Sequence, residues 1–184
     1  GMTACTFENF TTENCPPIIG QAKAAALDCV GKGGGLVLGG SAGTGKTHLA
    51  VAITQALVAG GKHAVFIPVV ELLDEMRKAT AAGRADEIMD AVRNAECLAL
   101  DDLGAERTND WVGERLFALV DHRYRHKEQT IVTTNAMNMA ELERMIGDRG
   151  TRIVSRLAQM AFPVFIKARD YRFNRDQGTL FKAG

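Results

Sequence analysis

A glycine-rich run that ends in a lysine and a threonine is the part of this sequence best suited to chemistry. It spans residues 40–47, reads Gly-Ser-Ala-Gly-Thr-Gly-Lys-Thr, and fits the pattern G-x-x-x-x-G-K-[ST] at every fixed position. Glycines let a backbone curl until successive N–H groups face one anion. An apolar segment precedes the run and an Ala/Leu-rich segment follows it, as a strand and a helix would around a phosphate-binding loop. We therefore predict a phosphate-binding loop here rather than a chance glycine-rich turn.

The residue types within this run predict how it would hold a nucleotide. The Lys46 ammonium would sit on the terminal phosphates, and the Thr47 hydroxyl would hold Mg²⁺. The following helix would point its positive end at the phosphates. The predicted nucleotide-binding set is Gly40, Ser41, Ala42, Gly43, Thr44, Gly45, Lys46, Thr47 and His48.

Two acids end a second apolar segment, Cys97–Leu100. Carboxylates at the carboxyl end of a parallel strand lie beside the phosphate crevice. We expect Asp101 to hold Mg²⁺, through water, and Asp102 to orient or deprotonate an attacking water. The alternative is a pair of solvated turn acids, and the complete phosphate loop favours the catalytic interpretation.

Polar residues also end a third apolar segment, Ile131-Val-Thr-Thr-Asn135. An asparagine both donates and accepts hydrogen bonds, so Asn135 could position the attacking water and contact the γ-phosphate. Asn135 could equally be the cap of the following helix.

Short apolar runs alternate with longer helical patterns, which predicts an α/β fold with a parallel sheet. The expected strands are 36–38, 64–67, 97–100, 130–133 and 164–166; the expected helices are 20–31, 45–59, 69–80, 84–95, 111–126, 139–146 and 151–161. A strand between the phosphate loop and the acidic strand is typical of P-loop proteins that hydrolyse nucleotides. We divide the chain into an irregular lead-in (1–19, with Gly1 a probable cleavage scar), a domain (20–168) and a short tail (169–184). The lead-in residues Phe7, Phe10, Ile18 and Ile19 border the adenine or belong to the core.

Composition excludes several classes of protein. The 184 residues include 22 Lys/Arg and 22 Asp/Glu, and 46% are apolar. This mix is typical of a globular domain and excludes a disordered chain, a fibrous repeat and a strongly basic nucleic-acid coat. There is no run of about 18 uncharged apolar residues and no visible signal peptide. The four cysteines form no C-x-x-C pair. We therefore expect a cytoplasmic protein with free thiols and no membrane contact.

The motifs occur in one order that resembles a known family. After Thr6-Phe-Glu-Asn-Phe10 come the phosphate loop, Leu100-Asp-Asp-Leu-Gly104, Arg123-Tyr124 and Thr133-Thr-Asn135. This pattern resembles the AAA+ ATPase domain of bacterial replicative-helicase loaders (DnaC/DnaI type) over residues 5–172. It is similar also to the IstB-type transposition helper ATPases. The resemblance implies a five-stranded parallel sheet of the AAA+ (ASCE) type, flanked by helices and without a full C-terminal lid.

The resemblance also implies ligands and residue roles. ATP and Mg²⁺ would bind at the phosphate loop, with Asp101 and Asp102 as the acidic pair and Asn135 as the first sensor. Arg156 would be the arginine finger that reaches the nucleotide of a neighbouring subunit, with Arg152 as the second choice. The alternative for Arg156 is an intramolecular ion pair. Tyr171-Arg172 resembles a second nucleotide sensor.

The implied function is an ATPase of DNA replication, weak alone and stimulated by self-association or DNA. Its partners would be a replicative helicase and single-stranded DNA, with Arg77, Lys78 and Arg84 as candidate DNA contacts on the helices between 69 and 95. Only about five residues precede Thr6, which leaves the helicase partner open. The alternatives are an IstB-like transposition helper, a P-loop small-molecule phosphotransferase and a nucleotide-gated adaptor.

Overall fold

Five parallel strands form the sheet that positions the candidate residues. The computed structural model describes residues 4–13, 15–106, 109–168 and 170. The strands are β1 (Gly35–Gly40), β2 (Ala64–Pro68), β3 (Cys97–Asp101), β4 (Gln129–Thr133) and β5 (Ala161–Ile166). Their spatial order is β2-β3-β4-β1-β5, and every pairing is parallel. The predicted five-stranded parallel sheet is confirmed, and β1 lies beside β4 rather than beside β2.

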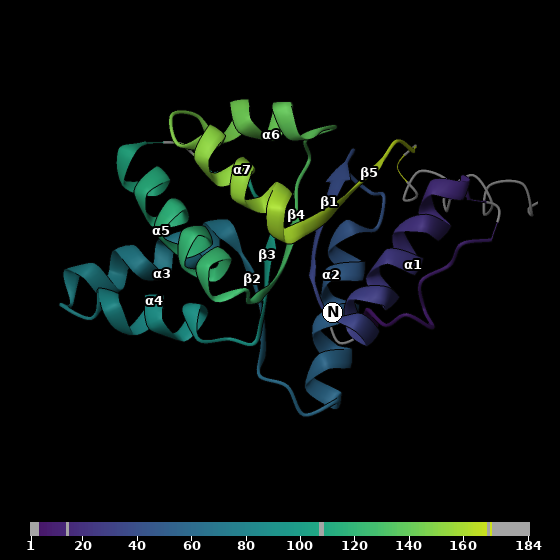
Figure 1. Ribbon diagram of the computed structural model, residues 1–184, viewed down its shortest axis with the longest axis horizontal. Coiled ribbons are helices and arrows are strands. Elements are labelled where there is room, and N and C mark those ends of the chain that lie inside the picture. Colours follow the sequence, from purple (N-terminus) through teal and green to yellow (C-terminus); the bar gives the residue numbers. More distant parts are fainter. Residues whose placement is uncertain (1–3, 14, 107–108, 169, 171–184) are drawn as a thin grey trace, which may run out of the picture.

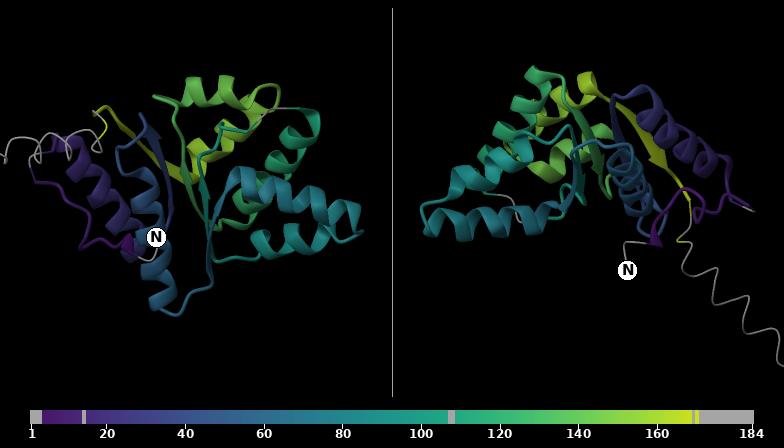
Figure 2. Two further views of the ribbon diagram at one scale, coloured as in Figure 1. Left: turned by 180° about the vertical axis from the view of Figure 1, so that it is seen from behind. Right: turned by 90° about the horizontal axis from the view of Figure 1, so that it is seen from below.

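Helices cover both faces of this sheet. They are α1 (Pro17–Lys32), α2 (Lys46–Ala59), α3 (Val69–Ala81), α4 (Ala85–Arg93), α5 (Asp110–His126), α6 (Met139–Ile146) and α7 (Gly150–Met160). Helices α1 and α2 lie on one side of the sheet, and α3 to α7 lie on the other (Figures 1 and 2). None of the helices in the described ranges has the length and apolarity to cross a membrane.

The central strands bury both of their faces, which explains their continuous apolar sequences. On β1, Leu36 and Leu38 pack in the core cluster beneath α1 and α2, whereas Val37 packs in the cluster beneath α3 to α7. The same alternation separates Ile131 from Val132 on β4. Strands covered on both sides need apolar residues at successive positions rather than at every second one.

Strand β5 differs most from the prediction. It begins at Ala161, three residues before the expected start, and its first half carries Pro163 and a Phe162 that is 67% exposed. Proline is tolerated because β5 is an edge strand that pairs only with β1. Pro163 and the exposed Phe162 therefore do not fit the run of buried apolar residues that marks a strand covered on both faces. In the part of the chain that the structure describes, no helical lid follows β5.

Arg123 is a fully buried arginine that joins three segments of the chain. Its guanidinium donates to the carbonyl oxygens of Val92, Arg93, Ala95 and Gln129 at 2.6–3.1 Å. The Nε–H donates to Thr130 Oγ1 at 2.9 Å, and Glu128 lies 3.2 Å from Nη1. These bonds tie the end of α4 and the start of β4 to α5. The arginine of the Arg123-Tyr124 pattern therefore has a structural role.

We predict that Arg123→Met lowers the free energy of unfolding by about 3–5 kcal/mol, because it strands buried carbonyl oxygens and the Glu128 carboxylate. Urea unfolding followed by circular dichroism measures this change. Arg125→Met is the matched control on the same helix, since the Arg125 side chain is 70% exposed, and it should change the free energy by less than about 1 kcal/mol. Equal effects of the two substitutions would contradict the assignment.

Candidate nucleotide site

The phosphate loop connects the end of β1 to the start of α2. Its backbone takes conformations that favour glycine, with φ of 129° at Gly40, 71° at Gly43 and 86° at Gly45. A Cβ on Gly40 would lie 2.2 Å from the Ile166 carbonyl oxygen, and one on Gly45 would lie 2.6 Å from Phe10 Cε2. The loop is therefore shaped by packing against β5 and the lead-in as well as by its own glycines.

Lys46 begins α2 and is held within this loop. Its Nζ donates to the carbonyl oxygens of Gly40 and Ser41 at 2.7 and 2.8 Å. A third bond, of 3.1 Å, reaches Asn135 Oδ1. The side chain is 7% exposed. Lys46 thus carries a buried positive charge at the N-terminus of a helix, where anions bind favourably.

Asp101 and Thr47 lie together at the carboxyl edge of the sheet. Thr47 Oγ1 donates to both carboxylate oxygens of Asp101, at 3.0 and 3.2 Å, and Asp101 is 8% exposed. A hydroxyl and a carboxylate supply the oxygen donors that Mg²⁺ prefers, with phosphate oxygens and waters completing its shell. No cluster of three or more His, Cys, Asp or Glu residues that could hold a metal occurs in the described ranges. The Thr47 hydroxyl and the Asp101 carboxylate fit a metal ion that a bound phosphate would share.

Asp102 and Asn135 continue the same hydrogen-bonded group. Asn135 Nδ2 donates to Asp102 Oδ1 at 2.7 Å, while Asn135 Oδ1 accepts from Lys46. Asp102 has a left-handed backbone, with φ of 59°, which costs a non-glycine residue about 1–2 kcal/mol. Such strain at a polar strand end is characteristic of functional sites. Lys46, Asp102 and Asn135, which come from three separate motifs, therefore lie together.

Thr133 is a member of this group that the sequence reasoning missed. Its Oγ1 donates to Asp101 Oδ1 at 2.6 Å and accepts from the Asp102 backbone N–H at 2.8 Å. The residue is 1% exposed. One buried hydroxyl thus fixes the carboxylate of the first acid and the backbone of the second. The Thr-Thr-Asn motif was visible, but only the sheet register reveals which threonine faces β3.

Comparison with known proteins assigns the family. The family model for IstB-like ATP binding proteins (IstB_IS21) matches residues 7–178. The chain belongs to this family. An insertion sequence IS21 putative ATP-binding protein of Pseudomonas aeruginosa is 30% identical over 162 residues, covering 86% of this chain and 60% of the relative. The replicative helicase loader DnaC of Escherichia coli (strain K12) is 27% identical over 150 residues, covering 79% of the chain and 60% of the loader. The IstB-like chain thus spans well under two thirds of both relatives.

Solved structures confirm the AAA+ fold of this IstB-like protein. The crystal structure of the DnaC helicase loader superposes with a TM-score of 0.81 at 28% identity, covering 90% of this chain and 98% of that one. The crystal structure of DnaI gives 0.79 at 25% identity, covering 90% and 93%. AMPPCP-bound DnaA from Aquifex aeolicus, at 19% identity, 95% and 54% coverage and a TM-score of 0.75, shares the fold.

His48, the last residue of the predicted nucleotide-binding set, faces the lead-in of the IstB-like protein. Its Nε2 lies 2.8 Å from the Thr6 carbonyl oxygen, and its ring stands edge-on to Phe10 at 5.3 Å. Phe10 and Ile19 belong to the core cluster beneath α1 and α2, with Phe7 and Ile18 packed against it. The structure thus shows these four residues in or against the core, and their contact with an adenine stays a prediction.

Neither candidate finger joins the group around Lys46 within one subunit. Arg156 lies on α7 and donates its Nε–H to Asp121 Oδ1 of α5. Arg152 is exposed, with its guanidinium carbon 5.9 Å from the centre of the Phe117 ring. Arg156 thus makes the intramolecular ion pair that was the alternative, and its role in a neighbouring site stays a prediction. Tyr171 and Arg172 lie outside the described residues.

Glu106 is a second site-proximal residue that no sequence signal indicated. Its Oε2 accepts from the Gly104 N–H at 2.9 Å, and the residue is 9% exposed. Burial is the main cause that raises the pKa of this carboxyl above its ordinary value, and the charge of Asp102 adds to it. It supports the turn that follows the two acids.

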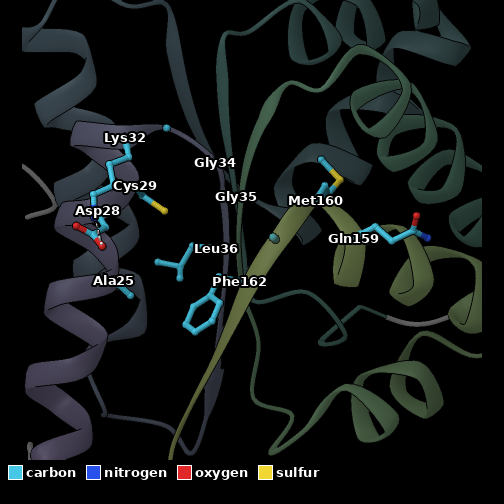
Figure 3. A pocket seen from close by; sticks show the side chains of 12 residues that line it. Ala25, Asp28, Cys29, Lys32, Gly34, Gly35, Leu36, Gln159, Met160 and Phe162 are labelled. Atoms are coloured by element: carbon cyan, nitrogen blue, oxygen red, sulfur yellow. Dashed lines mark hydrogen bonds and ion pairs between the residues drawn. The ribbon is translucent and has the colours of Figure 1, made fainter.

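A cavity of about 580 Å³ lies at the opposite edge of the sheet (Figure 3). Its walls come from α1, the end of α7 and the starts of β1 and β5, and include Cys29, Gly35 and Phe162. Asp28 and Lys32, its charged lining residues, pair with each other at 3.0 Å. None of the residues predicted to bind nucleotide lines this cavity.

We predict that Thr133→Val weakens the Mg²⁺-dependent binding of ATP by about 10- to 100-fold, because the hydroxyl that orients Asp101 is lost. Titration of a fluorescent ATP analogue at several Mg²⁺ concentrations measures the effect. Thr133→Ser is the control, since it keeps the hydroxyl and should bind nearly as well as the parent. If the valine variant bound Mg²⁺ and ATP normally, Thr133 would have no positioning role.

Proposed function

We propose that this chain hydrolyses ATP with Mg²⁺ and couples that reaction to single-stranded DNA and a partner protein. The observation that carries the proposal is the continuous group Lys46–Asn135–Asp102, beside the Thr47–Asp101 pair. It joins a cation suited to the γ-phosphate to a carboxylate suited to activating water. ATP binding also agrees with the IstB-like family.

The proposed reaction divides the work among these residues. The N–H groups of the loop and the Lys46 ammonium bind the phosphates. Thr47 and Asp101 would hold Mg²⁺, which when bound neutralises charge on the phosphate oxygens. Asp102 takes a proton from the attacking water, and Asn135 orients that water. Because Asn135 contacts both Lys46 and Asp102, its amide links phosphate binding to the base.

The proposed DNA contacts rest on a second group of side chains. Arg77, Lys78 and Arg84 each pair with an acid three residues away, at 2.7, 2.7 and 3.6 Å. The α3–α4 segment (69–93) also holds six acidic residues against four basic ones, so these three cations do not form a basic surface by themselves. Trp111, at the start of α5, lies 5.1 Å from the Arg77 guanidinium carbon and 5.9 Å from that of Arg115. Trp111 is partly buried against the core cluster beneath α3 to α7, so we propose that its exposed part, beside two guanidinium groups, stacks on a base together with phosphate contact.

We propose a helicase-loader role, and a transposition helper is the second candidate. The DnaC fold agreement over 98% of that chain favours the first, and the IstB-like family match favours the second. Affinity capture of the purified replicative helicase of the source organism by the full-length gene product separates them. Capture that depends on ATP supports the loader role. A protein that binds ATP and DNA but not the helicase supports the helper role.

Substitution of Lys46 and Asp102 tests the proposed reaction. Lys46→Ala should abolish ATP binding, because it removes the charge that meets the phosphates. Asp102→Asn should keep ATP affinity within about threefold but lower hydrolysis by about 10²- to 10⁴-fold, as loss of a general base does. Equilibrium binding and phosphate release measure the two quantities separately. Normal hydrolysis by Asp102→Asn would show that this residue does not activate water.

Substitution of Trp111 tests the proposed DNA contact. We expect Trp111→Ala to weaken binding of single-stranded oligonucleotides by about tenfold or more, since one stacked base is lost. Fluorescence anisotropy with a labelled oligonucleotide and an ATP analogue provides the measurement. Phe162→Ala is the matched control, because it removes an aromatic ring that is 67% exposed on β5. A Trp111→Ala protein with unchanged affinity would remove the stacking contact from the proposal.

A further inference from the structure

A carboxylate on α5 holds Arg156 more firmly than an isolated ion pair would. Asp121 Oδ1 accepts the Nε–H of Arg156, and Asp121 Oδ2 lies 2.7 Å from Nη2 of Arg125. The Asp121 side chain is 12% exposed and that of Arg156 is 24% exposed, whereas Arg125 is 70% exposed. Asp121 is therefore a nearly buried acid between a surface arginine and a partly covered one.

Three more contacts restrict the orientation of the Arg156 guanidinium. Its carbon lies 4.7 Å from the centre of the Phe117 ring and 5.9 Å from that of the Tyr124 ring, both cation–π distances, and Nη1 donates to the Arg152 carbonyl oxygen at 3.2 Å. These contacts use the Nε–H and one Nη1–H, and no other hydrogen bond of this guanidinium occurs within the described ranges. Nη2 thus has no hydrogen-bond partner among the described residues, and the Arg156 side chain is 24% exposed.

The charge of the group also suits contact with an anion. One carboxylate stands between two guanidinium groups, so the Asp121–Arg125–Arg156 group keeps a net charge of +1. An arginine neutralised by its own carboxylate would be a poor partner for phosphate, whereas this group still attracts one. Arg152, by contrast, makes no ion pair among the residues that the structure describes.

We propose that Asp121 is the positioning residue that holds Arg156 ready to act on the nucleotide of a neighbouring subunit. An unrestrained arginine samples many rotamers, and only a few of them would place Nη2 on the phosphate. Anchoring Nε to Asp121 removes that freedom before the subunits meet. The inference depends on the proposed ATPase function and on Arg156 as its trans-acting arginine.

Mixtures of variants test this role, because a defect on the arginine side of an interface is rescued differently from a defect on the nucleotide side. The variants are Asp121→Asn, Asp121→Glu, Arg156→Ala and Lys46→Ala, and ATPase activity is measured with single-stranded DNA. Asp121→Asn alone should lose more than about tenfold in kcat while its affinity for ATP stays unchanged. Asp121→Glu, which keeps the charge, should recover part of the loss. Asp28→Asn is the matched control, since it removes a helical ion pair on α1 that is remote from this group.

An equimolar mixture of Asp121→Asn with Lys46→Ala should regain activity, because one supplies an intact nucleotide site and the other an intact Arg156. A mixture of Asp121→Asn with Arg156→Ala should stay inactive, because both lack a positioned arginine. A misfolded Asp121→Asn protein could not give this pattern.

Several results would overturn the inference. Normal activity of Asp121→Asn alone would show that Arg156 needs no anchor, and a higher kcat would show that Asp121 restrains the arginine instead. Rescue of Asp121→Asn by Arg156→Ala would place the defect in the nucleotide site. Full activity of Arg156→Ala would contradict the prediction that Arg156 acts on a neighbouring nucleotide, and the inference would fall with it. Loss of activity in Arg156→Ala with no loss in Asp121→Asn would overturn the inference and leave that prediction standing.

Discussion

The pairing of β1 with β4 is the constraint on which the candidate site depends. Leu38 lies opposite Thr133, and the pairing continues past the strand ends, where the Thr134 N–H donates to the Leu38 carbonyl oxygen at 3.0 Å. The Gly40 N–H donates to the Ala136 carbonyl oxygen at 2.8 Å in the same way. This register brings Lys46 to Asn135, 89 positions further along the chain. The pairing of β3 with β4 then adds the two acids.

The hydrogen bonds of Lys46 give the candidate site a defined arrangement. An ammonium group has three N–H donors, and the contacts to Gly40, Ser41 and Asn135 engage all three. A γ-phosphate that binds Lys46 must therefore replace at least one of them. Replacement of the Asn135 contact would leave the Asn135 amide oxygen without this donor and let the amide turn. The hydrogen bonds of Lys46 thus hold the loop in this arrangement, and a bound phosphate can still displace one of them.

Contiguous features were predictable from the sequence, and features that depend on register were not. The phosphate loop, the acids at 101–102 and Asn135 each stand at the end of an apolar run, so their shared edge followed from a parallel sheet. Thr133 required knowledge of which strand lies beside β4. The early start of β5 was missed because an edge strand needs no covered face, and Phe162 and Pro163 carry no such pattern.

Arg123 and Arg156 also show that the sequence alone does not reveal a role that depends on tertiary packing. Arg123 is fully buried and donates hydrogen bonds to several carbonyl oxygens. Arg156, on a neighbouring helix, keeps 24% of its side chain exposed. Nothing in their local sequence separates a structural arginine from one that faces outward. The distinction arises from what packs against each side chain, and only tertiary structure supplies it.

Asp102 has a left-handed backbone conformation, which glycine adopts more easily than aspartate. Glycine adopts φ near 59° without steric penalty, so at this position it would relieve about 1–2 kcal/mol of strain. It would also delete the carboxylate that Asn135 holds. Glycine at this position would therefore exchange the hydrogen bond that Asn135 donates for a relaxed backbone.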